Sequence, residues 1–307
     1  MITINRRYYD EYFYDLACKL SELNTHKVIY DPLQTAWIDH VVEGAVVFTQ
    51  DCYSYDNGQQ RLTDADIDSI KALPEFYLAS SVYNLQEDIS LPNVTHLHPG
   101  SDLLFQKQQY STLLSAKAKT WQGEHWVTLG RVPRPHRLAV AEYLKKSGLS
   151  GVAIRVDKKS FPATANNNAM NFNVFLRDVY VNTAVEIVLE TTFYNKGIFV
   201  TEKYLNSVYG YNFPILIANC GTVEYLQKQG FDLFTDIVDH SYDKVQDPAQ
   251  RLQQAIDKNI HLLQDKDHAI EQWKSCKDRF DRNLAYARKD FYTWSANKFM
   301  CSATNLA

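Results

Sequence analysis

Short apolar runs alternate with segments of helical periodicity along most of the chain. Runs of about four to eight apolar residues between polar turns are typical of buried strands, and apolar residues spaced by three and four are typical of helices. Strands and helices in this regular alternation predict parallel α/β sheets. In the first part of the chain the pattern predicts strands at 27–30, 45–48, 76–79 and 94–98 and helices at 16–23 and 65–73.

A second alternation of the same kind begins near residue 126, after a polar stretch at 106–123 that is typical of a linker. Gly148 and Gly230 stand where two of the predicted helices end, as glycine often does. The tail at 269–300 has the pattern of one or two long amphipathic helices. The second half is predicted to hold strands at 126–129, 151–156, 184–189 and 213–218 and helices at 137–146, from 201, at 222–229 and within 248–263.

The length of 307 residues exceeds that of a typical single domain, which favours two domains. We therefore expect an α/β protein of two Rossmann-like domains with a C-terminal helical tail. The expected domains are residues 1–120, residues 121–280, and a helix at 281–307 that packs back on the first domain. Several kinds of two-domain α/β protein share this plan, so the fold alone does not decide the function.

Charge and cysteine content narrow the class of protein. The net charge of −4 is mild, so no overall basic field indicates nucleic acid, although a local basic face stays open. The five cysteines are scattered without a C-x-x-C pair, which argues against a disulfide framework or a zinc site and favours the cytoplasm. The first residues are polar and no apolar run approaches about 20 residues, so neither a signal peptide nor a membrane span is expected.

Motifs for several other chemistries are missing or have a local explanation. Asp64 and Asp66 form a D-x-D pattern, but Thr63 stands at an N-cap position, so these acids are expected to serve a helix start. His96 and His98 would face one side of a strand without a third ligand near them in sequence. The sequence lacks the glycine-rich NAD and P-loop patterns and the G-x-S-x-G pattern. We therefore expect no metal site and no bound cofactor.

The strongest candidate site begins at Glu190 and continues to the segment Phe-Val-Thr-Glu-Lys at 199–203. Glu190 follows a predicted strand, at the end where open α/β sheets bind ligands, and is a candidate catalytic residue. Thr201 is placed to cap a helix, whose N-terminus suits a diphosphate. Glu202 can accept hydrogen bonds from two ribose hydroxyls, and Lys203 can neutralise phosphate. The alternative is an ordinary capped and charged first turn.

A basic segment at 130–137, Gly-Arg-Val-Pro-Arg-Pro-His-Arg, lies between a predicted strand and a predicted helix. Because it follows a strand at the expected ligand edge, Arg131 and Arg137 are candidates for binding phosphate. The alternative is a solvated basic turn stiffened by proline.

The order of these motifs resembles the C-terminal half of a family of glycosyltransferase-like proteins common in tailed phages. That family's pattern has TEK, a small-residue helix, a strand that begins with Pro, G-[ST]-x-x-x-L, GF-x-x-F, YD and Arg, with N-R-x-x-R-x-H-R upstream. A Glu-Lys helix start before such a strand is also similar to the donor-binding segment of fucosyltransferase-like and other GT-B enzymes. The matching stretches fall within about residues 126–255 and include Pro214, Gly221, Gly230, Phe231, Phe234, Tyr242, Asp243 and Arg251.

The resemblance implies a GT-B-like architecture with a nucleotide-diphosphate sugar bound in the C-terminal domain. Glu202 would then hold the ribose, and Lys203, Arg131 and Arg137 would lie near the diphosphate. Arg134 and His98 are the candidates for binding the acceptor. GT-B enzymes usually need no metal for this, because cations and a helix dipole take its place.

Three departures from the family pattern leave sugar and base specificity open. Gly130 stands where Asn is usual, Tyr204 where Thr is usual, and Asn-Ser at 206–207 where Lys-Pro is usual. The paired glutamates of retaining enzymes are also absent at their usual spacing, since Glu190 and Glu202 are twelve positions apart. The stereochemistry is therefore unassigned.

The catalytic base and the acceptor are the open parts of this hypothesis. Asp51, after a strand-like run, is preferred as the base over Asp31 and His98. The phage resemblance suggests a 5-hydroxymethylated base in viral DNA, in the host cytoplasm, and a glycan or protein acceptor is the alternative. The rivals are a non-catalytic GT-B-like protein that binds a nucleotide or glycan, and an epimerase. A DNA acceptor needs a basic, aromatic-lined face, for which the candidates are Lys107, Lys117, Lys119, Trp121, Trp126, Arg131 and Arg134.

Overall fold

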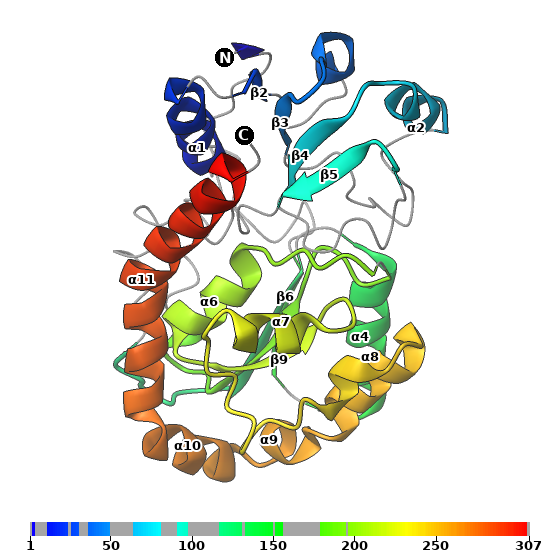
Figure 1. The fold of residues 1–307 in the computed structure, drawn as a ribbon. Coiled ribbons are helices and arrows are strands. Elements are labelled where there is room, and N and C mark those ends of the chain that lie inside the picture. The colour runs from blue at the N-terminus through cyan, green and yellow to red at the C-terminus, as the bar shows by residue number, and fades with distance from the viewer. Residues whose placement is uncertain are drawn as a thin grey trace, which may run out of the picture. The chain divides into compact units, whose positions relative to one another are not determined.

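Two parallel β-sheets and the helices around them make up the fold, as Figure 1 shows. A computed structural model of the protein describes residues 2–3, 11–23, 26–30, 36–49, 64–80, 91–97, 117–130, 133–149, 151–155, 179–194 and 196–305. The mixed α/β class with parallel sheets, predicted from the apolar pattern, is confirmed. The chain divides into two compact units, unit 1 with residues 1–106, 194–200 and 289–307 and unit 2 with residues 107–193 and 201–288.

The sheet of unit 1 has the strand order β1-β2-β3-β4-β5, and every neighbouring pair is parallel. Four of its strands coincide with the predicted apolar runs to within one or two residues, and the two-residue β1 was not predicted. The strands are β1 (Ile2–Thr3), β2 (Val28–Tyr30), β3 (Val46–Thr49), β4 (Phe76–Ser80) and β5 (Val94–Leu97), and the helices are α1 (Glu11–Glu22), η1 (Ala36–His40) and α2 (Asp64–Lys71).

The core of unit 1 is built on its three middle strands. Ile29, Val47 and Leu78 lie side by side in the register of β2, β3 and β4, and all three are fully buried. Ile70 of α2 and Phe199 belong to the same cluster. Strands buried on both faces have continuous apolar sequences, which is why the sequence pattern locates them well.

The sheet of unit 2 has the order β7-β6-β8-β9 and is also parallel throughout. The edge of β9 is covered, because Leu216 N donates to the Tyr242 hydroxyl (2.8 Å) and Arg251 Nε donates to Ala218 O (3.2 Å). Covering an edge in this way prevents it from pairing with another chain. The elements are β6 (Trp126–Gly130), α4 (Pro135–Lys146), β7 (Val152–Arg155), β8 (Val185–Leu189), α6 (Glu202–Gly210), β9 (Phe213–Ile217), α7 (Thr222–Lys228) and η4 (Ser241–Lys244).

Four helices follow: α8 (Pro248–Asp257), α9 (Ile260–Gln264), α10 (Lys266–Ser275) and α11 (Lys277–Thr304). The helical pattern within 248–263 is divided between α8 and α9 at Asn259. The Asn259 side chain donates to Asp239 O (3.0 Å) and Ala255 O (2.9 Å) and accepts from Asp239 N (2.8 Å). Tertiary hydrogen bonds therefore place this break, which periodicity does not reveal.

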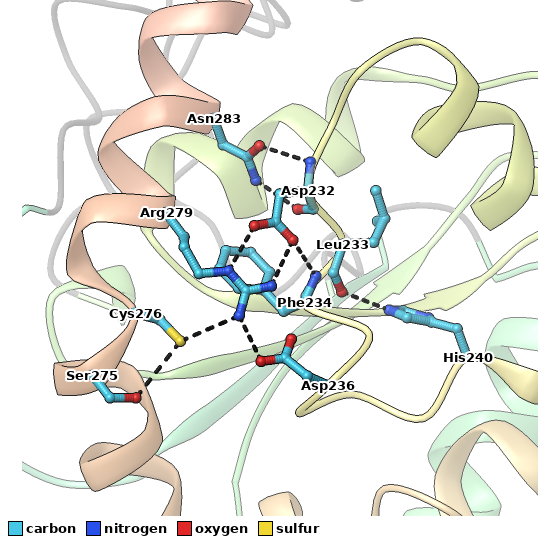
Figure 2. Close-up of polar contacts among 9 residues, drawn as sticks. All are labelled: Asp232, Leu233, Phe234, Asp236, His240, Ser275, Cys276, Arg279 and Asn283. Carbon is cyan, nitrogen blue, oxygen red and sulfur yellow. Dashed lines mark hydrogen bonds and ion pairs between the residues drawn. The ribbon is translucent and has the colours of Figure 1, made fainter.

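Helix α11 is fastened within unit 2 by Arg279, which Figure 2 shows in detail. Its guanidinium donates to both carboxylate oxygens of Asp232 (2.6 and 2.7 Å) and to Asp236 (2.8 Å), and it lies 4.8 Å from the centre of the Phe234 ring. Asn283, one turn further along α11, accepts from Asp232 N (2.9 Å) and donates to Asp232 O (2.7 Å). The G-F-x-x-F segment is thus a docking point for α11.

Arg279→Met is expected to lower the free energy of unfolding of unit 2 by about 2 kcal/mol, because two carboxylates lose a charge-assisted partner. Urea unfolding measures this change. Arg282→Met, at an exposed position on the same helix, is the matched control and should change stability by less than about 0.5 kcal/mol. Equal losses in the two variants would contradict this role of Arg279.

Candidate functional site

The strand order of unit 2 reverses beside β6. After β6 the chain adds β7 on one side, and β8 and β9 follow on the other side. In open parallel sheets, ligands bind outside the carboxyl ends of the strands at such a reversal. The reversal lies between the paired strands β6 and β8, which end at Gly130 and Leu189. The residues that follow these strands therefore define the candidate site.

Glu190 directly follows β8 at this edge and is 0% exposed. Its Oε1 accepts a hydrogen bond from Thr201 N (3.1 Å), and its Oε2 accepts from Thr191 N (3.2 Å) and from the Thr201 hydroxyl. A buried carboxylate requires such donors, because burial otherwise costs it the hydration of its charge. Glu190 therefore ties the end of β8 to the beginning of α6.

Thr201 is the N-cap of α6, as predicted, and its side chain accepts from Lys203 N (3.5 Å). The ammonium of Lys203 turns back over this cap. It donates to the hydroxyls of Thr191 (3.2 Å) and Thr201 (3.0 Å). Lys203 is thereby held at the carboxyl edge of the sheet, next to the end of β8.

The basic segment before α4 reaches the same place from the side of β6. Arg134 Nη1 donates to Thr191 O (2.8 Å), and Arg137 Nη2 donates to Glu190 O (3.1 Å). His136 Nε2 also lies 3.0 Å from Glu190 O, and it is the donor because a carbonyl only accepts. The first turn of α4 is the positive end of the helix dipole, and it carries basic side chains and no acidic residue.

His136 is buried, and Arg134, Arg137 and Lys203 lie close enough to influence its ring. Its ring stacks on Phe193 with centroids 5.2 Å apart. Burial, together with the nearby charges of Arg137, Arg134 and Lys203, lowers the pKa of His136 to about 4. The imidazole is therefore neutral at neutral pH, and three positive charges act on one buried ring.

Arg251 forms the framework behind this site. It is 3% exposed, lies 4.6 Å from the centre of the Phe193 ring and donates to Phe193 O (2.6 Å), Ala218 O (3.2 Å) and Val245 O (2.7 Å). These bonds join the end of β8, the end of β9 and the start of α8. In the sequence Arg251 stands out only as part of the family-like pattern.

The N-terminus of α7, at the same edge, is occupied by a carboxylate of the chain itself. Asp243 Oδ2 accepts from Glu224 N (3.3 Å), and Asp243 O accepts from Gly221 N (3.0 Å). Burial raises the pKa of Asp243, while bonds from the amides of Val223 and Glu224 counteract this rise. The Tyr-Asp part of the family-like pattern thus builds the framework of unit 2.

The structure brings together Glu190, Arg134, Arg137, Thr201 and Lys203 among the residues predicted from the sequence. Two further polar pairs complete the edge, and sequence reasoning missed them because threonine and asparagine carry no distinctive pattern. Thr191 contacts Lys203 as described above, and Thr192 Oγ1 accepts from Asn219 Nδ2 (2.9 Å) after β9. Their positions directly after two strands are the only signal in the sequence.

Four predicted residues cannot be placed in this way. Asp51, His98 and Arg131 lie outside the residues that the structure describes. Glu202 is the first residue of α6, and only its backbone is described. Their roles as catalytic base, acceptor ligand and donor ligands stay predictions.

A basic, aromatic-lined surface was expected to include Lys119 and Trp126, and this prediction is wrong for both residues. Lys119 directs its ammonium inward to oxygens of the loops before β8 and β9, at the sheet edge opposite Glu190. Trp126 is 1% exposed, because it is the buried first residue of β6. Lys117 is exposed and pairs with Asp281 (2.7 Å). Lys107 lies outside the described residues.

Metal and membrane features were sought in the described part of the chain. Within it, no group of three or more His, Cys, Asp and Glu side chains is arranged to hold a metal ion. Asp64 is the first residue of helix α2, which agrees with the prediction that this acid serves a helix start. None of the described helices is long and apolar enough to cross a membrane.

Fold and site define an α/β protein whose second unit gathers cationic side chains at the carboxyl edge of a parallel sheet. Comparison with protein-family models, with curated proteins and with solved structures found no match for the chain.

Proposed function

We propose that this protein is a glycosyltransferase of GT-B-like, two-domain architecture. It transfers a sugar from a nucleotide-diphosphate donor to an acceptor hydroxyl, and the donor binds at the carboxyl edge of the sheet in unit 2. The convergence of Arg134, Arg137 and Lys203 on this edge is the observation that carries the proposal.

Three features of the cluster suit a diphosphate. The cations hydrogen-bond to the backbone carbonyl oxygens of Glu190 and Thr191 and to threonine hydroxyls, and these bonds fix the side chains at the edge. They lie at a reversal of strand order, where open sheets bind ligands. The start of α4 is also the positive end of a helix dipole, which favours a bound anion.

The same residues would assist the chemical step. When the bond between the sugar and the diphosphate breaks, negative charge develops on the departing phosphate oxygen. Fixed cations stabilise that charge more in the transition state than in the ground state, which accelerates the reaction. Glu202 would hold the ribose and Asp51 would take the acceptor proton. The acceptor is a 5-hydroxymethylated base in viral DNA or, alternatively, a glycan or protein hydroxyl.

Lys203→Met is expected to weaken binding of UDP or GDP by about 10- to 100-fold, because it removes one charge-assisted hydrogen bond to phosphate. Isothermal titration calorimetry with both nucleotides measures the change. Lys228→Met is the matched control. This lysine is exposed on α7 and pairs with Glu224 (2.6 Å), so its replacement should leave binding intact.

The binding result separates the candidate functions. Failure of the wild-type protein to bind any nucleoside diphosphate, or equal binding by Lys203→Met, would sink the proposal. Binding without transfer to hydroxymethylated DNA, glycans or protein would favour the non-catalytic alternative. Mass analysis of each acceptor after incubation with UDP- and GDP-sugars distinguishes these outcomes.

A further inference from the structure

Glu190 and Lys203 are joined through a threonine hydroxyl at the start of α6. The Thr201 hydroxyl donates to Glu190 Oε2, and its oxygen accepts from Lys203 Nζ at 3.0 Å. The direction of these bonds is fixed, because an ionised carboxylate only accepts and an ammonium only donates. The result is a continuous chain from ammonium to hydroxyl to carboxylate.

A second connection runs through Thr191. Its amide donates to Glu190 Oε2 (3.2 Å), and its hydroxyl accepts from Lys203 Nζ (3.2 Å). Glu190 therefore fixes the backbone or side chain of both residues that hold the ammonium. Consecutive hydrogen bonds of this kind strengthen one another, because each bond polarises the next.

We infer that Glu190 is a positioning residue that sets the place of the Lys203 ammonium through Thr191 and Thr201. The carboxylate is 0% exposed, and both of its oxygens accept hydrogen bonds from the chain. This geometry suits a fixed support better than a group that exchanges protons with a substrate. The ligand that Lys203 meets, a nucleoside diphosphate, rests on the proposed function, whereas the positioning itself does not.

The inference can be tested without any ligand by following the Lys203 ammonium in 15N-labelled protein. Ammonium protons held in hydrogen bonds exchange slowly with water and give a resolved nitrogen–proton signal, which Lys203→Arg assigns by its disappearance. In Glu190→Gln one of the two acceptor oxygens is replaced by an amide donor, so the side chain can no longer accept from all three of its donors on Thr191 and Thr201, and the signal should be lost. Thr201→Val should lose the signal as well, and Thr201→Ser should keep it.

Each outcome decides the inference. Persistence of the signal in folded Glu190→Gln, or in Thr201→Val should Glu190→Gln fail to fold, would overturn it. Loss of the signal in Thr201→Val with rescue by Thr201→Ser supports it, because a cap that only stabilised the helix would not move the ammonium.

UDP binding provides the second readout. Glu190→Gln should weaken it by about 10-fold or more, as expected for a residue that supports a ligand-binding side chain. If the signal behaves as expected and the wild-type protein binds no nucleoside diphosphate, the positioning role stands and the proposed function fails.

Discussion

Replacing Lys119 with methionine is expected to lower the free energy of unfolding of unit 2 by about 3 to 5 kcal/mol, because four oxygens lose their hydrogen bonds to a charged donor. Methionine matches the length of lysine but cannot donate a hydrogen bond, so the oxygens around the ammonium would lose their donor. These oxygens come from the loops before β8 and β9, and they are Tyr180 O (2.7 Å), Thr183 O (2.7 Å), Gly210 O (2.5 Å) and Asn212 Oδ1 (2.7 Å).

Glu186 is a buried acid on which the charge of Lys119 acts. It is 1% exposed and accepts from the Tyr180 hydroxyl (2.9 Å). Burial raises the pKa of Glu186 to about 8, and the charge of Lys119 opposes that rise. Without the ammonium, the ionised form of Glu186 would be still less favourable inside the protein.

Lys117→Met is the matched control for Lys119→Met. Lys117 lies two positions away, its side chain is 54% exposed, and its ion pair with Asp281 should contribute less than about 1 kcal/mol. Thermal unfolding followed by tryptophan fluorescence suits the comparison, because the rings of Trp121 and Trp273 lie 6.0 and 5.8 Å from Lys119 Nζ. The role of Lys119 is refuted if the two variants unfold at the same temperature.

Lys119 also illustrates what the sequence can and cannot predict. It lies in a polar stretch of low strand propensity, and a lysine there is normally exposed. Its four acceptors lie 61 to 93 positions away in the chain. Only the folded chain brings them together, so composition indicated a basic surface where the structure has a part-buried lysine that joins two loops.

The strands could be predicted because their signal lies in consecutive residues. In β8, all five residues from Val185 to Leu189 are buried, and four of them are apolar, so the signal is contained in the strand itself. The position of Glu190 after this strand was likewise sufficient to place it at the ligand edge. Local pattern therefore predicts the elements and the edge at which their ends meet.

The arrangement within the candidate site was not predictable. Arg137 and Glu190 are 53 positions apart, and the bond between them joins a side chain to a backbone carbonyl, which any residue at position 190 could provide. The residue type at position 190 therefore does not reveal such a contact. The threonines that hold Lys203 are equally inconspicuous, because threonine is common after strands and at helix caps.

Acidification is expected to reduce the stability of unit 2 by about 3 kcal/mol through His240 alone. This residue is 8% exposed, its Nε2 donates to Leu233 O (2.9 Å), and its Nδ1 accepts from the Tyr242 hydroxyl (3.1 Å). The same hydroxyl accepts from Leu216 N in β9 (2.8 Å). A second proton on the ring would face a hydroxyl that already donates to it, and this would disturb the cover of the sheet edge.

The pKa of His240 gives the direction and the pH range of this effect. Burial lowers the pKa to about 4, against 6.5 for the ordinary group that stands for the unfolded chain. Above pH 6.5 the ring is neutral in both states, so its contribution is fully present. As the pH falls from 6.5 towards 4, the unfolded state takes up the proton first and stability is lost, by about 1.4 kcal/mol for each pKa unit.

Several other groups shape the same pH profile, among them His136 and Glu186. His136 acts in the same direction, because burial also lowers its pKa to about 4. Glu186 acts in the opposite direction, since its folded pKa of about 8 lies above the ordinary value of 4.5 and its protonation favours the folded state as the pH falls. The effect of one histidine must therefore be isolated by a variant.

His240→Gln isolates the effect, because the glutamine amide can still donate to Leu233 O and does not titrate. Urea unfolding at several pH values between about 7 and 4.5 should show a smaller acid loss in the variant than in the wild-type protein. The difference should approach about 3 kcal/mol at the acid end, because that is the linkage contribution of one buried neutral histidine. Parallel profiles, or an NMR titration that finds the folded-state pKa of His240 near 6.5, would show that the ring is not held neutral by its burial.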